Sequence, residues 1–133
     1  MKKKILLIDD DQIFHYLHSK VIALAGIEAD IITAGHGLEG MEIITKMIEN
    51  GEELPTEVFI DLNMPNMNGF EFIRAVNDLD FPGKSQMKMI VVTSSVNSAD
   101  RVIADELGIK YFLTKPLLVR DVAEVLAVNA NRE

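Results

Sequence analysis

Short apolar runs alternate along the chain with longer segments in which apolar residues recur at helical spacing. The runs are rich in β-branched and aromatic residues and stop at polar, glycine-containing or proline-containing loops. This pattern is typical of strands that are buried on both faces of a parallel sheet. We therefore expect strands at residues 5–8, 29–34, 57–60, 89–93 and 111–114.

Between these runs, apolar residues recur every three or four positions, which predicts five helices that each turn one apolar face toward the core. The faces are expected to consist of Ile13, Phe14, Leu17, Val21 and Leu24; Leu38, Met41, Ile44 and Ile48; Phe72, Ile73, Val76 and Leu79; Val102, Ile103 and Leu107; and Leu118, Val122, Val125 and Leu126. His15 and His18 then lie on the solvent side of the first helix. Ile43 and Met47 lie opposite the core stripe of the second helix, either as a contact patch or as ordinary exposed apolar residues.

The alternation of strand and helix predicts an α/β fold, with a parallel sheet, right-handed crossovers and helices on both faces. We expect the flavodoxin-like (βα)5 arrangement, a five-stranded sheet with the strand order 2-1-3-4-5. The length of 133 residues suits a single domain, which we place at residues 1–133 without a second globular unit.

The charge and composition argue against several classes of function. The chain has 13 basic and 21 acidic residues and a net charge of −8, which opposes binding to phosphate backbones or anionic lipid. The apolar run after Lys4 meets aspartates within four residues, and no other run is long enough to span a membrane. The absence of cysteine excludes disulfides, a thiol nucleophile and a zinc–thiolate site. We predict a cytoplasmic protein that binds no nucleic acid and does not insert into membranes.

Polar residues follow or end four of the predicted strands: Asp9 and Asp10, Asp61, Thr93, and Lys115. In an open α/β sheet, ligands bind just beyond the carboxyl ends of the strands, so these side chains are expected to meet at one edge. Two carboxylates 4 Å apart repel by roughly 4 kcal/mol at an effective dielectric constant near 20, so such a cluster requires a cation or bound protons. A pocket of oxygen ligands without His or Cys favours Mg²⁺.

With Mg²⁺ bound, Asp61 is a candidate nucleophile toward a phosphoryl group. Lys115 would neutralise charge on the phosphoryl oxygens during transfer, and the Thr93 hydroxyl would donate a hydrogen bond to one of them. The predicted product is an aspartyl phosphate.

Simpler interpretations of the same residues stay open. Asp9 to Asp11 could be an acidic helix start, and Asp11 is expected to cap the first helix. Asp61 alone could initiate a turn, Thr93 could be a core threonine, and Lys115 could be a surface lysine.

Four motifs stand in this order at the predicted strand ends: Ile8-Asp9-Asp10, residues 61–69 (Asp-Leu-Asn-Met-Pro-Asn-Met-Asn-Gly), Val92-Thr93-Ser94 and Lys115-Pro116. Together they make the chain resemble the receiver domains of two-component response regulators, of which the CheY-like chemotaxis proteins are the single-domain type. The likeness covers essentially the whole chain. It implies a stand-alone receiver domain without an output domain.

The resemblance implies that Asp61 accepts a phosphoryl group from a sensor histidine kinase or a histidine phosphotransfer protein. Asp10 and Asp61 would bind Mg²⁺ together with the backbone carbonyl of Asn63, and Asp9 would act mostly through a coordinated water. Such a protein phosphorylates and dephosphorylates itself and is not a turnover enzyme.

The resemblance also implies a conformational switch. Lys115 would pair with the Asp61 carboxylate or its phosphoryl group, and the Lys115–Pro116 bond would be cis. Thr93 would swing toward the phosphoryl group and Phe112 would turn inward. The surface formed by the last two helices and the last strand would then shift its population of states and regulate a protein partner that the sequence does not identify.

Two positions depart from the commonest pattern of the family. Asn68 stands where the family often has aspartate, and Phe112 lacks the hydroxyl of a tyrosine switch. Asn serves the turn before Gly69 equally well. Asn63 and Ser95 are implied to modulate dephosphorylation.

Other functions compete with the switch. The domain could drain phosphoryl groups from a kinase as a phosphate sink. The run Ile8 to Asp11 also fits a haloacid-dehalogenase-type phosphatase with Asp9 as nucleophile, although the chain is short for that fold. A pseudo-receiver adaptor is a third class, but it typically lacks the acceptor or metal residues, which are present here.

Overall fold

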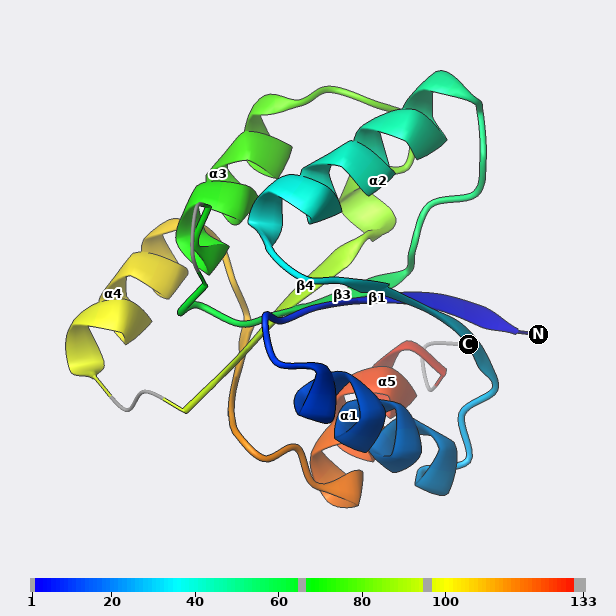
Figure 1. Cartoon of the computed structure of the whole chain (residues 1–133), viewed down its shortest axis with the longest axis vertical. Coiled ribbons are helices and arrows are strands. Elements are labelled where there is room, and N and C mark those ends of the chain that lie inside the picture. Colours follow the sequence, from blue (N-terminus) through cyan, green and yellow to red (C-terminus); the bar gives the residue numbers. More distant parts are fainter. Residues whose placement is uncertain (1, 65–66, 95–96, 131–133) are drawn as a thin grey trace.

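The computed structural model describes residues 2–64, 67–94 and 97–130, which form one five-stranded parallel sheet flanked by helices (Figure 1). The elements are β1 (Lys3–Ile8), α1 (Gln12–Leu24), β2 (Ala29–Ala34), α2 (Gly37–Glu49), β3 (Glu57–Ile60), α3 (Gly69–Asp78), the 3₁₀ turn η1 (Lys84–Gln86), β4 (Lys88–Thr93), α4 (Ser98–Glu106), β5 (Tyr111–Thr114) and α5 (Val119–Ala130). The strand order is β2-β1-β3-β4-β5. The predicted flavodoxin-like α/β fold is therefore confirmed.

The register of the sheet aligns the carboxyl ends of its central strands. Ile8 of β1 lies opposite Ile60 of β3, and Ile60 lies opposite Val91 of β4. Because the strands are parallel, the residues that follow β1 and β3 leave the sheet at the same edge. Asp9 and Asp61 are these residues, and the Asp61 N–H donates to the Ile8 carbonyl at 3.0 Å.

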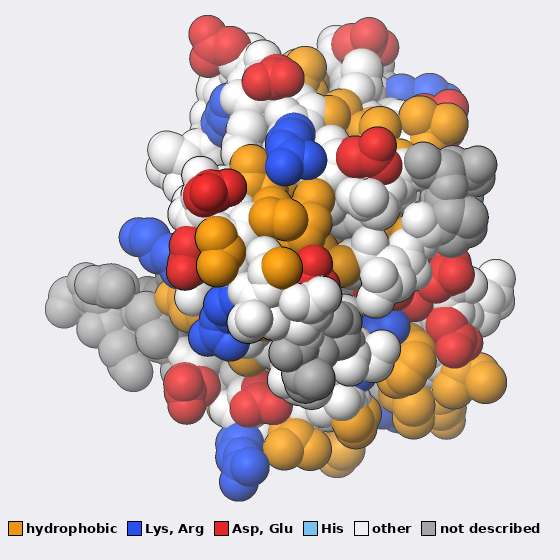
Figure 2. Space-filling model, turned by 90° about the vertical axis from the view of Figure 1, so that its left-hand side faces the viewer, with side chains coloured by type: hydrophobic (Ala, Val, Ile, Leu, Met, Phe, Trp, Pro, Cys, Tyr) orange, Lys and Arg blue, Asp and Glu red, His pale blue; other side chains and the backbone are white. Residues whose placement is uncertain are grey.

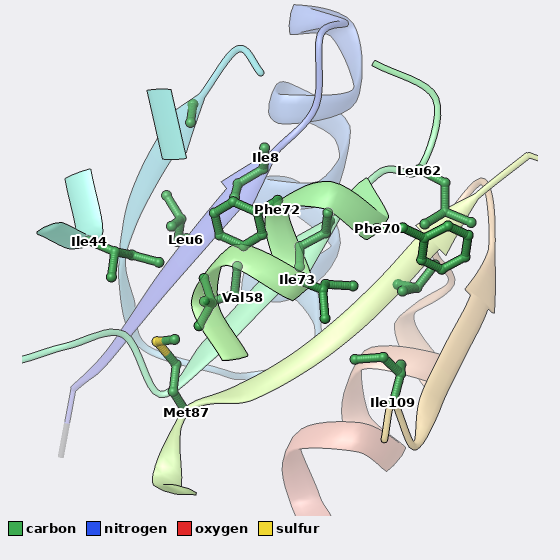
Figure 3. Packing of buried hydrophobic residues seen from close by; sticks show 14 of the residues in the cluster. Leu6, Ile8, Ile44, Val58, Leu62, Phe70, Phe72, Ile73, Met87 and Ile109 are labelled. Carbon is green, nitrogen blue, oxygen red and sulfur yellow. The ribbon is translucent and has the colours of Figure 1, made fainter. Parts of the chain in front are cut away.

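Alternate residues of the strands pack into two separate cores, one on each face of the sheet. The first core joins Leu6 and Val58 to the inner residues of α2 and α3, including Phe72 and Ile73 (Figure 3). The second core joins Ile5 and the other strand residues that point to the opposite face of the sheet to residues of α1 and α5. These two helices cover that face in Figure 1. Both faces are buried, which explains why the strands are continuous apolar runs.

The prediction for the buried face of α1 was wrong. His18 is only 4% exposed and Ile22 is buried, whereas Leu24 is 73% exposed and Ile13 and Leu17 are also exposed. The helix carries two overlapping apolar stripes, and packing against the sheet and α5 selects the one that contains the imidazole of His18. A neutral imidazole can be buried, but a hydrophobic pattern counts histidine as polar.

The prediction for α2 was also wrong at three positions. Ile43, which was expected opposite the core stripe, is partly buried and packs against the core. Met47 is 7% exposed and belongs to the buried face, while Leu38 is exposed. Gly37 and Gly40 lie on the same face, and a Cβ at Gly40 would lie 2.6 Å from Ile8 Cδ1. Because Gly40 lets α2 lie close to Ile8, the glycine side of the helix faces the core and Leu38 faces away. A search for apolar residues does not register glycines, so it missed this face.

Two further residues differ from the expected faces, because Val102 of α4 and Leu118 before α5 are exposed. The remaining expected faces of α3 and α5 pack as predicted, with Phe72, Ile73, Val76, Val122, Val125 and Leu126 buried. Within the described residues, none of the helices has the length and hydrophobicity needed to cross a membrane.

Candidate functional site

Three carboxylates meet at the carboxyl edge of the sheet and form what we call the acidic pocket. Asp9, Asp10 and Asp61 each offer an oxygen, and these oxygens all lie within 4.8 Å of one another. Asp9 and Asp61 are buried and Asp10 is exposed. The convergence predicted from the strand ends is therefore confirmed for these residues.

The turn between β1 and α1 fixes the Asp9 side chain. Its Oδ1 accepts a hydrogen bond from the Asp11 N–H at 2.9 Å. Asp11 in turn accepts from the Ile13 N–H at 2.9 Å and is the N-cap of α1, as predicted. The first turn of the helix thus holds one wall of the acidic pocket in place.

Lys115 enters the acidic pocket from the end of β5. Its Nζ lies 2.7 Å from Asp9 Oδ2 and 3.4 Å from Asp61 Oδ2. The backbone N–H of Lys115 donates to the Thr93 carbonyl at 2.9 Å. The Lys115–Pro116 peptide bond is cis, as the resemblance implied. The resemblance implied a pairing with Asp61, but Asp9 is the nearer partner, so the ammonium bridges both buried carboxylates.

The environment of Asp61 opposes its ionisation. Burial raises the pKa of its carboxyl above the ordinary value and the Asp9 charge raises it further, while Lys115 and the Asn63 N–H lower it in part. The Asn63 N–H lies 3.4 Å from Asp61 Oδ1. Asp61 is thus a poorly solvated carboxylate, and Lys115 and the Asn63 N–H offset only part of the cost of its negative charge. Such a carboxylate gains from interaction with a metal ion or an electrophile.

The loop after β3 requires glycine where it turns into α3. A Cβ at Gly69 would lie 2.6 Å from the Asp61 carbonyl oxygen and 2.9 Å from Leu62 Cα, both backbone atoms. Asn68 caps α3 in a reciprocal capping box with Glu71, with each hydrogen bond 2.9 Å long. Asn at position 68 therefore serves this turn, as predicted. Gly69 acts on the site through the backbone, which the residue pattern did not reveal.

The predicted switch residues lie on β4 and β5. Thr93 ends β4 and is fully buried, and Phe112 lies opposite Val91 in the sheet register. Phe112 is half-buried and packs against the core beneath α4, with the Arg101 guanidinium 5.0 Å from its ring centroid. Ser95, which was expected to modulate dephosphorylation, lies outside the described residues, as do positions 65 and 66 of the loop motif.

Sequence reasoning missed two residues of α1 near the acidic pocket. The Phe14 ring centroid lies 4.0 Å from Lys115 Nζ, and His18 lies next to Phe14 with ring centroids 5.4 Å apart. Phe14 was expected only as a core residue of this helix, and His18 was expected on its solvent side. The only sequence signal for His18 was that a neutral histidine can be a core residue, which would have placed it on the buried face of α1.

Comparisons with known proteins agree with this geometry. Residues 5–127 match the family model for the response regulator receiver domain. The chemotaxis protein CheY of Thermotoga maritima is 29% identical over 126 residues, which cover 95% of this chain and 96% of that protein. The crystal structure of a two-component response regulator from Cytophaga hutchinsonii has a TM-score of 0.88 and 25% identity, with 99% of this chain and all of the other chain (100%) covered.

A much longer protein also contains a similar segment. The sensor histidine kinase CheAY of Helicobacter pylori is 32% identical over 112 residues, which cover 84% of this chain but only 13% of the kinase. The chain thus corresponds to a small part of that relative. The family match over residues 5–127, together with the strand order, shows that the chain belongs to the response regulator receiver domains of two-component signalling.

Proposed function

We propose that this protein is a phospho-accepting switch in which Asp61 takes a phosphoryl group from a histidine of a sensor kinase or a histidine phosphotransfer protein. The observation that carries the proposal is the convergence of three carboxylates within 4.8 Å, with the Lys115 ammonium 3.4 Å from Asp61. Family membership supports the receiver function over a haloacid-dehalogenase-type phosphatase that uses Asp9. A cytoplasmic location accompanies the proposal, because ATP-dependent kinases act there.

The donor set of the acidic pocket fits a hard divalent cation. Its carboxylate oxygens lie close enough for mutual repulsion, and one lysine does not neutralise three acidic groups. Asp9, Asp10 and Asp61, with the Asn63 carbonyl, are the residues that would hold Mg²⁺. Bound there, Mg²⁺ would supply Lewis-acid stabilisation of phosphoryl oxygens beside the Asp61 carboxylate.

In the proposed transfer, an Asp61 carboxylate oxygen attacks phosphorus and forms a new O–P bond. The P–N bond to the donor histidine breaks, and the imidazole nitrogen retains the electron pair and takes up a proton. Lys115 stabilises the charge on the phosphoryl oxygens, and the Thr93 hydroxyl donates to one of them. Dephosphorylation is a hydrolysis: water attacks phosphorus, the O–P bond to Asp61 breaks, the Asp61 carboxylate retains the electron pair, and inorganic phosphate is released.

The proposed output surface consists of α4, β5 and α5. Phe112 is half-buried and contacts Arg101 of α4, so an inward turn of its ring would change this surface. The α4 side of the molecule faces the viewer in Figure 2, where apolar, acidic and basic side chains are interspersed. A mixed surface of this kind suits a protein partner. A phosphate sink is the alternative outcome, in which phosphorylation recruits no partner.

Incubation with acetyl phosphate and Mg²⁺, followed by intact-mass measurement, tests the proposal. The wild type should gain the mass of one phosphoryl group, whereas Asp61→Asn and a sample with EDTA should gain none. Sustained hydrolysis of phosphomonoesters that is lost in Asp9→Asn and kept in Asp61→Asn would support the phosphatase instead. A pull-down with and without beryllofluoride would then separate a switch from a phosphate sink.

A further inference from the structure

The Lys115 ammonium has an aromatic neighbour in addition to its two carboxylates. Its Nζ lies 4.0 Å from the centroid of the Phe14 ring, 2.7 Å from Asp9 and 3.4 Å from Asp61. A cation at this distance over a ring face is attracted by the ring quadrupole, and the attraction is stronger where water is excluded. The Lys115 side chain is 7% exposed, so the contact is largely desolvated.

The Phe14 ring is itself held by the packing of α1. It lies against His18, with ring centroids 5.4 Å apart and planes tilted by 38°. His18 is buried, and its Nε2 has no hydrogen-bond partner within the described part of the chain. Burial lowers the pKa of His18 to about 4, so the imidazole is neutral at pH 7 and packs as an apolar ring. Phe14 therefore lies between a neutral ring and a charged amine.

We propose that Phe14 is a positioning residue for phosphoryl transfer, because its ring holds the Lys115 ammonium against the carboxylates of Asp9 and Asp61. A lysine side chain has many rotamers, so holding it in one of them costs conformational entropy. Several favourable contacts are needed to offset that cost. The two carboxylates attract the ammonium from one side and the ring attracts it from another. An aliphatic residue at position 14 would exclude water but would not attract the charge.

This role predicts opposite effects on two properties of the acidic pocket. The inference rests on the proposed function of Asp61, for which Lys115 must face the phosphoryl group. The same ammonium repels a divalent cation among the carboxylates. A variant without the ring should therefore release Lys115, which slows phosphoryl transfer but tightens Mg²⁺ binding. A general loosening of the fold would weaken both properties.

The variants Phe14→Leu and Phe14→Met remove the ring and keep an apolar side chain, and Phe14→Tyr keeps the ring. With acetyl phosphate at saturating Mg²⁺, Phe14→Leu and Phe14→Met should be phosphorylated about tenfold more slowly and should bind Mg²⁺ several-fold more tightly by calorimetry. Phe14→Tyr should keep the phosphorylation rate and the Mg²⁺ affinity of the wild type. Phe81→Leu is the matched control, because Phe81 is buried before β4 at the opposite edge of the sheet. Both values should be unchanged in Phe81→Leu.

A double-mutant cycle with Lys115→Met shows whether Phe14 acts through the lysine. In metal-free urea unfolding, Phe14→Leu should lower the unfolding midpoint less in the Lys115→Met background than in the wild type. Equal losses in both backgrounds, or weaker Mg²⁺ binding by Phe14→Leu, would overturn the inference. Failure of the proposed function is recognised separately, because the wild type would then not be phosphorylated while the metal-free cycle would still report the contact.

Discussion

Asp9 and Lys115 form a 2.7 Å ion pair whose two side chains are 5% and 7% exposed. The pair lies beside Asp61, so one ammonium compensates two buried carboxylates. Removing one partner of a buried pair is strongly destabilising when it leaves an uncompensated charge. Removing Asp9 and removing Lys115 are not equivalent here. Without Asp9, the Lys115 ammonium still pairs with Asp61, whereas without Lys115 two neighbouring carboxylates are left without a cation.

Lys115→Met should lower the free energy of unfolding by about 3 kcal/mol in the absence of metal, because it leaves the Asp9 and Asp61 carboxylates buried without a cation. Asp9→Asn should change it by only about 1 kcal/mol or less, since Lys115 keeps Asp61 as partner and the repulsion between carboxylates is relieved. Urea unfolding at pH 7 with EDTA measures both values. A larger loss for Asp9→Asn than for Lys115→Met would contradict this account.

Asp61→Asn should stabilise the protein at pH 7. The pKa of Asp61 is raised in the folded state, chiefly by burial, so folding favours the protonated form. The ionised carboxylate therefore opposes folding at neutral pH, and this opposition disappears as the pH falls through the folded-state pKa. In metal-free urea unfolding between pH 7 and pH 4, the wild type should approach the stability of Asp61→Asn. A gap that is independent of pH would argue against the raised pKa.

His18 should titrate far below an ordinary histidine. Burial lowers its pKa from 6.5 to about 4, Asp9 opposes this shift, and Lys115 and His15 add to it. The unfolded state then binds more protons, so stability should fall as the pH decreases from about 6.5 to 4, by at most about 1.4 kcal/mol per pH unit. His18→Leu should show a shallower decrease than the wild type. Imidazole NMR signals of His18 that titrate near pH 6.5 would refute the assignment.

Gly69→Ala should disturb the site through the backbone. Its Cβ would lie 2.6 Å from the Asp61 carbonyl oxygen, so the loop or α3 must move. We expect a loss of about 1–3 kcal/mol in stability, together with slower phosphorylation. Gly35→Ala is a suitable control, because its Cβ would lie 3.5 Å from Glu39 Oε1, an ordinary contact. Equal behaviour of the two variants in urea unfolding and acetyl phosphate labelling would show that the close approach is not required.

The strands and the acidic pocket could be predicted because both depend on the sheet. Strands buried on both faces are continuous apolar runs, and the predicted bounds of 29–34, 57–60 and 111–114 match the structure. The carboxyl ends of parallel strands meet at one edge, which places Asp9 beside Asp61 whatever the helices do.

The helix rotations could not be predicted, because tertiary packing chooses between overlapping stripes. In α1 the choice buries a histidine, and in α2 it buries a face that begins with glycine. An apolar pattern placed Phe14 on the inner face of α1, but it cannot show which residue of another element the ring contacts, so the contact with Lys115 could not be predicted. The predicted roles of the two switch residues, Thr93 and Phe112, remain proposals.

In the proposed function, Asp61 itself carries the phosphoryl group. The protein should be labelled with acetyl phosphate and Mg²⁺, reduced with borohydride, which converts an aspartyl phosphate to homoserine, and digested for tandem mass spectrometry. This account predicts homoserine at position 61 and at no other aspartate. Homoserine at position 9, or no homoserine in a protein that gained phosphoryl mass, would contradict it.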